Sequence, residues 1–122
     1  MDAQETQIEE YTLELKEHQL KINGRLHTIR ELDGTDRAKY LNSVSSRVKV
    51  NNQGKPVGMT TFEGLETSLL KLCLYDGDEL VPEKVMSKWP ASLLGKFFDI
   101  ASDLSGLNEA AKKRMQEESK ND

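Results

Sequence analysis

The dipeptide Asn23-Gly24 constrains the fold of this chain more than any other feature of its sequence. It separates two stretches, "LKI" and "RLHTI", that contain apolar and β-prone residues. Both residues of the pair adopt positive φ readily, as the central positions of a type I′ turn require. Together with the alternation in "YTLEL", which begins at Tyr11, the pair predicts a β-hairpin over residues 11–31.

The length of the loop also predicts the register of this hairpin. A two-residue loop pairs Ile22 with Arg25 and Leu20 with His27. Leu26 then lies on the face opposite Ile22, so the apolar residues of the two strands do not share one face. We therefore expect either that both faces are partly covered or that a β-bulge shifts the register.

The rest of the chain has apolar residues at helical spacing, interrupted by turn-forming segments such as "NNQGKPVG" and "YDGDE". Pro82 suits the first turn of a short helix, in which Val85 and Met86 face inward. Gly106 suits the position that follows the last helix. The pattern predicts a loop over residues 51–58 and helices over residues 35–48, 61–75, 82–88 and 92–105.

These elements predict a mainly α protein of the α+β class, in which an N-terminal hairpin packs on a small bundle of about four helices. Residues 11–107 form its single domain, because a chain of 122 residues buries one modest core. Residues 1–10 are expected to be a flexible N-terminus. Residues 108–122 are expected to be a charged C-terminal helix or tail.

Composition argues against several classes of protein. The net charge of −4 comes from 17 basic residues scattered among 21 acidic ones, which does not suit a nucleic-acid-binding surface. No stretch approaches the roughly 20 apolar residues that span a bilayer. The polar, acidic N-terminus lacks the features of a signal peptide, so we expect a cytoplasmic protein. The one cysteine excludes an internal disulfide and a cysteine-based zinc site.

Few residues suggest catalysis, and we expect no catalytic, cofactor-binding or metal-binding site. His18 and His27 can approach each other on one hairpin face, but only Glu17 and Glu31 are near in sequence as further metal ligands. Surface histidines are the simpler interpretation. Cys73 could be a thiol nucleophile, but its place on the apolar face of the most hydrophobic helix indicates a small core residue.

The large apolar residues of the C-terminal half are candidates for binding a partner. Phe97 and Phe98 are adjacent and point about 100° apart on a helix, so one can enter the core while the other contacts a partner. A fully internal cluster is the alternative. The hairpin must likewise pack on the helices or pair with another chain, because an isolated hairpin is marginally stable. The candidate partner-binding residues are Trp89, Leu94, Phe97, Phe98, Leu20 and Ile22.

The order of these elements resembles a known family. "GLETSLLKLCLYD" is followed closely by the acidic turn "DGDELV", and "WPASLLGKFFDIASDLSGLN" precedes a charged C-terminus. These pieces are similar to the tail assembly chaperones of long-tailed bacteriophages and prophages, over residues 11–115. The motifs are patterns of apolar and turn residues and include no catalytic signature.

The resemblance implies a non-enzymatic protein that binds the tape measure protein and helps to recruit tail tube protein. Such proteins act in the cytoplasm of the bacterial host and are absent from the mature virion, and many have a longer form made by translational frameshift. The alternative is a structural or adaptor protein of the phage particle, such as a tail completion protein. An unpaired hairpin edge also allows self-association into a homo-oligomer. Neither nucleic acid nor a membrane is an expected partner.

Overall fold

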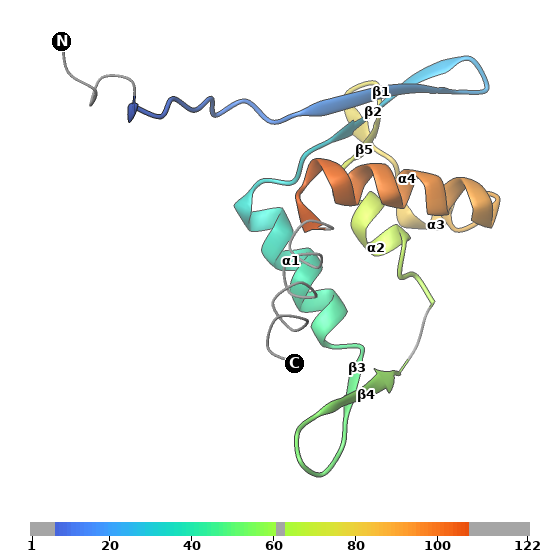
Figure 1. Ribbon diagram of the computed structural model, residues 1–122. Coiled ribbons are helices and arrows are strands. Elements are labelled where there is room, and N and C mark those ends of the chain that lie inside the picture. The colour runs from blue at the N-terminus through green and yellow to red at the C-terminus, as the bar shows by residue number, and fades with distance from the viewer. Residues whose placement is uncertain (1–6, 61–62, 108–122) are drawn as a thin grey trace.

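The computed structural model describes residues 7–60 and 63–107 (Figure 1). It is 36% helical and 24% strand, and it contains a four-stranded antiparallel sheet and a separate two-stranded sheet. The prediction of a mainly α protein is therefore wrong, although the N-terminal hairpin is present. The charged C-terminal segment predicted over 108–122, and most of the flexible N-terminus predicted over 1–10, lie outside the described residues.

The larger sheet has the strand order β1-β2-β5-β6. Its strands are β1 (Glu17–Ile22), β2 (Arg25–Arg30), β5 (Leu74–Asp76) and β6 (Glu79–Leu80). The two hairpins β1–β2 and β5–β6 join because β2 pairs with β5 in antiparallel fashion. The N-terminal hairpin is thus half of a sheet and not the lone hairpin that the sequence predicted.

The predicted register of the N-terminal hairpin is confirmed. Ile22 pairs with Arg25 and Leu20 with His27, without a bulge. Asn23 and Gly24 have φ values of 51° and 82°, as the turn requires. The strand begins at Glu17, however, and the alternating segment from residue 11 onward is not part of it.

One face of the hairpin is covered and the other is open. Leu20 and Ile22 are half-buried and Ile29 is fully buried on the covered face, against the helices. Leu26, on the opposite face, is 52% exposed. His27 shares the covered face and is only 5% exposed, so its interpretation as a surface histidine is wrong.

Four helices lie on one side of the sheet (Figure 1). They are α1 (Gly34–Ser45), α2 (Thr67–Leu70), α3 (Glu83–Met86) and α4 (Ala91–Leu104). The side chain of Asp33 caps α1 by accepting a hydrogen bond from the backbone N–H of Asp36 at 2.8 Å. Helix α4 contacts β2 on one side and α2 on the other.

The long helix predicted over 61–75 is replaced by the short helix α2 and the strand β5. Leu69, Leu70, Cys73 and Leu74 are all almost completely buried. An apolar run that is covered on every side has no periodicity to distinguish a helix from a buried strand. The pairing of Leu74 with Ile29 of β2 decides in favour of a strand at this end.

A second hairpin projects from the end of α1. It consists of β3 (Val48–Val50) and β4 (Pro56–Met59), which pair in antiparallel fashion with an irregularity between Lys49 and Val50. The sequence predicted a helix up to residue 48 and a loop over 51–58. Because Val50 and Val57 are both about three-fifths exposed, this hairpin adds no core that sequence patterning could reveal.

The core lies between the sheet and the helices. It contains Ile29 and Leu74 from the sheet, Leu69 and Leu70 from α2, and Met86 from α3. The remaining core residues are Leu32, Tyr40, Cys73, Val81, Leu94, Phe97 and Ala101. Among the described residues, no helix has the length and apolar character needed to cross a membrane.

Candidate functional site

An open hollow of about 540 Å³ lies where the β5–β6 hairpin meets β2 and α3. Its apolar wall consists of Leu80, Val81, Pro82, Val85 and Trp89. Leu80 and Val85 are each 43% exposed, whereas Val81 is buried and forms part of the core. We call this cavity the Trp89 hollow. Its wall therefore presents large apolar side chains to solvent on a frame that is anchored in the core.

The rim of the Trp89 hollow is charged and mostly acidic. It consists of Arg25, Asp76, Asp78 and Glu79. Two hydrogen bonds of 2.9 and 3.0 Å join Nη2 of Arg25 to the two carboxylate oxygens of Asp76. Asp78 and Glu79 are exposed and leave an excess of negative charge at the rim. This combination suits an apolar side chain that is flanked by a basic residue.

The β5–β6 turn positions this rim. Asp76 pairs with Glu79 across a two-residue loop, and Gly77 takes a φ of 65° at its first position. The sequence pattern of this segment predicted a turn only. A Gly-Asp pair between "LYD" and "EL" is itself a hairpin signal, and it could have revealed both strands.

The structure separates the six predicted partner-binding residues into two groups. Leu94 and Phe97 are 7% and 6% exposed and belong to the core, so Phe97 is the phenylalanine that enters it. The others, Phe98, Trp89, Leu20 and Ile22, are half-buried and pack against the core.

Of the six, only Trp89 lines the hollow. Sequence reasoning missed Leu80, which lies in the segment interpreted as a turn. It also placed Val85 inward together with Met86. Met86 is fully buried as predicted, but Val85 is 43% exposed and faces the hollow. A helix of only four residues has too few positions for its periodicity to assign the face of each.

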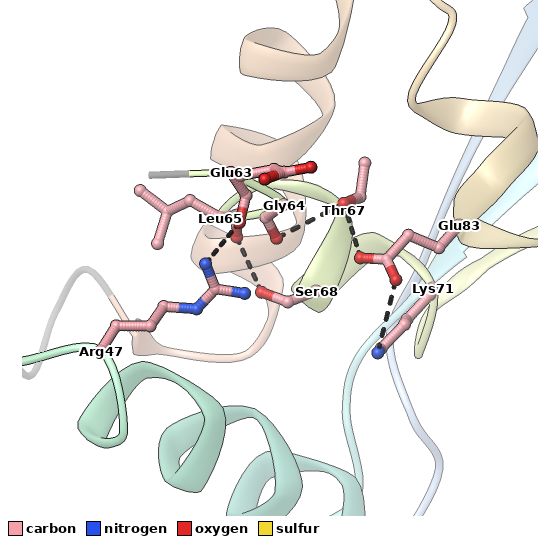
Figure 2. A network of polar contacts seen from close by, with 8 residues as sticks. All are labelled: Arg47, Glu63, Gly64, Leu65, Thr67, Ser68, Lys71 and Glu83. Carbon is pink, nitrogen blue, oxygen red and sulfur yellow. Dashed lines mark hydrogen bonds and ion pairs between the residues drawn. The ribbon is translucent and has the colours of Figure 1, made fainter. Parts of the chain in front are cut away.

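A second hollow, of about 720 Å³, lies between the end of α1, α2 and α3 and is lined largely by polar groups. Figure 2 shows their contacts. The hydroxyl of Thr67 donates to Oε2 of Glu83 at 2.8 Å, and Nζ of Lys71 lies 3.8 Å from Oε1 of the same carboxylate. Arg47 donates to the backbone oxygen of Glu63. Because these groups bond to one another across four segments, we interpret the network as a structural link.

Cys73, His27 and His18 are the residues that the sequence offers as candidates for catalysis or metal binding. Burial raises the pKa of Cys73 to about 12, and its thiol lies 3.5 Å from the backbone oxygen of Leu69. The interpretation of Cys73 as a core residue is confirmed, since it is 1% exposed. Nδ1 of His27 lies 3.0 Å from the backbone oxygen of Arg25, while His18 is exposed. Within residues 7–60 and 63–107, no three His, Cys, Asp or Glu side chains are arranged to hold a metal ion.

Comparison of the chain with protein-family models, with curated proteins and with solved structures gave no match.

Proposed function

We propose that this protein is a non-enzymatic tail assembly chaperone that binds the tape measure protein in the Trp89 hollow. The resemblance of its motifs supports the proposal that it is a tail assembly chaperone. One structural observation supports the Trp89 hollow as the binding site. Leu80 and Val85 expose apolar surface beside Trp89, under a rim with excess negative charge. The predicted partners, the tape measure protein and the tail tube protein, remain part of this proposal.

The hollow favours an amphipathic helix of the client as its occupant. Such a helix can insert an apolar anchor between Leu80 and Val85 while a Lys or Arg one turn away meets Asp78. Burial of the anchor contributes most of the affinity, because exposed charge pairs contribute little. The charged rim instead orients the helix and excludes acidic segments.

Holding the client in this way keeps its apolar surface from self-association until tail tube subunits are added. A protein in this role acts in the cytoplasm of the bacterial host and leaves before the virion is complete. A longer form made by frameshift adds to this proposal and is tested by the nucleotide sequence. The Lys112-Lys113 codons must contain or adjoin an A-rich slippery heptamer.

The alternative is a structural or adaptor protein that stays in the particle, such as a tail completion protein. The same apolar hollow could hold a neighbouring virion subunit permanently. Mass spectrometry of purified particles separates the two functions. The chaperone proposal predicts that the protein is absent from them, and stoichiometric amounts would favour the adaptor.

Co-expression with the tape measure protein tests the proposal. We expect the wild-type protein to raise the soluble fraction of the client and to form a complex with it on gel filtration. Val85→Asp places a charge in the apolar wall and should abolish both effects. Val57→Asp makes the same change at an exposed valine of β4, away from the hollow, and should abolish neither. Absence of a wild-type complex, or equal loss in both variants, would contradict the proposal.

A further inference from the structure

The first ten described residues, 7–16, form an arm that continues the line of β1 away from the sheet (Figure 1). Alternate apolar side chains of this arm are exposed: Tyr11 is 81%, Leu13 98% and Leu15 40% exposed. Among the described residues, the hydrogen bonds of residues 7–15 stay within the arm, from Tyr11 to Glu9 and from Glu14 N–H to Thr12. Of residues 7–16, Lys16 alone bonds to the described part of the domain, through Glu31. An extended apolar arm of this kind exposes surface that a second polypeptide can cover.

The strand that follows the arm has an open edge. Among the described residues, β1 (Glu17–Ile22) pairs only with β2, and its other edge presents backbone N–H and C=O groups to solvent. An open edge of six residues is a template for a further strand. The arm is thus an extended segment without a partner strand in the described part of the chain, and the β1 edge can accept one.

We propose that two copies of this chain form a two-fold dimer by exchanging their arms, each of which adds an antiparallel strand to the open β1 edge of the other. The two-fold axis is perpendicular to the sheets and passes beside Leu15, which lies opposite its own copy. Residues 8–13 of one copy then lie opposite residues 22–17 of the other. The two domains then lie on opposite sides of the axis. This inference does not depend on the proposed chaperone function.

Charge complementarity selects this register. With the axis at Leu15, Glu14 lies opposite Lys16 and Glu9 lies opposite Lys21, and symmetry repeats both pairs. Ile8 lies opposite Ile22. Moving the axis by one residue in either direction places Glu14 or Lys16 opposite its own copy, and like charges directly opposite each other are destabilising. The arm-exchange register is thus favoured over both of its neighbours.

Direct pairing of the two β1 edges is a second symmetric arrangement with an opposite-charge pair. With its axis at Gln19 it places Glu17 opposite Lys21. Glu17 already bonds to Nε of Arg30 at 2.8 Å, however, and this arrangement leaves Leu13 exposed. Arm exchange instead gives the backbone of the arm a partner strand, in which Leu13 lies opposite Glu17 of the other copy and Leu15 meets its own copy.

Cysteine cross-linking distinguishes the two arrangements. Residues directly opposite on antiparallel strands have Cα atoms about 4.5–5.5 Å apart, within the range of a disulfide. Leu15→Cys should therefore form a disulfide-linked dimer under mild oxidation, and Gln19→Cys should not. The native Cys73 is 1% exposed and serves as an internal background control in the wild type. Faster linking through position 19, or no linking at either position, would overturn the proposal.

Charge exchange tests the register independently. Lys16→Glu places Glu14 opposite an acidic residue. It should raise the dissociation constant of the dimer on the order of tenfold, as measured by sedimentation equilibrium. The double variant Glu14→Lys with Lys16→Glu restores opposite charges and should restore the dimer. Lys96→Glu, on the exposed surface of α4, is the matched control and should have no effect. A monomeric wild type, or a double variant as weak as the single one, would contradict arm exchange.

Discussion

The indole ring of Trp89 meets the ring of Phe97 edge-on, with centroids 6.5 Å apart and ring planes at 82°. This is a favourable aromatic geometry. Phe97 belongs to the core while Trp89 lines the hollow, so this contact fixes the apolar wall to the interior of the protein. The side chain of Trp89 thus joins the wall of the hollow to the core.

Truncation of Phe97 should be the most damaging change at this contact. Phe97→Ala removes a buried ring and should reduce the free energy of unfolding by about 3–5 kcal/mol. Phe98→Ala removes a half-buried ring from the same helix and should cost distinctly less. Urea unfolding followed by the fluorescence of Trp89, the one tryptophan, measures both. Equal losses would show that Phe97 is not the phenylalanine that anchors the wall.

The buried thiol of Cys73 predicts a pH dependence. Burial raises its pKa from the ordinary value of 9.0 to about 12. Between these values the unfolded chain loses the proton and the folded chain keeps it, so stability falls as the pH rises above 9.0. The slope contributed by this one group is at most about 1.4 kcal/mol per pH unit.

Cys73→Ala is the control for this slope. Burial also raises the pKa of Tyr40, so the wild type and the variant share a further decline at high pH. The difference between their unfolding free energies isolates the thiol. That difference should shrink steadily above pH 9.0, and a constant difference would show that the thiol ionises as readily in the folded protein.

Replacing either of two glycines that have open surroundings with alanine should change the free energy of unfolding, and the two changes should have opposite signs. Gly77 has a φ of 65° in the β5–β6 turn, and an added Cβ meets no atom within 4 Å. Gly77→Ala should therefore destabilise by about 1–2 kcal/mol through backbone strain alone. Gly34 has equally open space in the first turn of α1, and Gly34→Ala should stabilise by about 0.4–1 kcal/mol. Thermal unfolding measures the change in stability of both variants. Two changes in the same direction would contradict this prediction.

The cap of α1 provides a fourth prediction. The Asp33 side chain accepts from the N–H of Asp36 at 2.8 Å, so Asp33→Ala should cost about 1 kcal/mol. Asp33→Asn keeps an acceptor at the same position and should cost much less. Unfolding in urea compares the two, and similar losses would indicate that the carboxylate acts through its charge and not through the hydrogen bond.

Local signals in the sequence predicted the parts of the fold that depend on a few neighbouring residues. Asn23-Gly24 determined the turn and register of the first hairpin, because positive φ at both positions permits few alternatives. The strand β5 was missed because it depends on pairing with β2, 45 or more residues earlier in the chain. Leu74, its one fully buried residue, continues the buried run from Leu69 and would look the same in a helix.

The residues of the candidate site were also only partly predictable from local signals in the sequence. Trp89 stood out as a single large residue at a helix end, and it does line the hollow. Leu80 and Val85 carry no such signal, because their exposure follows from how the β5–β6 hairpin meets α3. Arg25 and Asp76 are 51 residues apart, and only the β2–β5 pairing brings them to one rim.

Hydrogen–deuterium exchange of the co-purified complex with the tape measure protein tests the central claim most directly. The proposal predicts added protection in β6 (Glu79–Leu80) and α3 (Glu83–Met86), relative to the free protein. The β3–β4 hairpin, which is as exposed but lies away from the hollow, should exchange as before. Protection confined to β3–β4, or unchanged exchange in both segments, would contradict binding of the client in the Trp89 hollow.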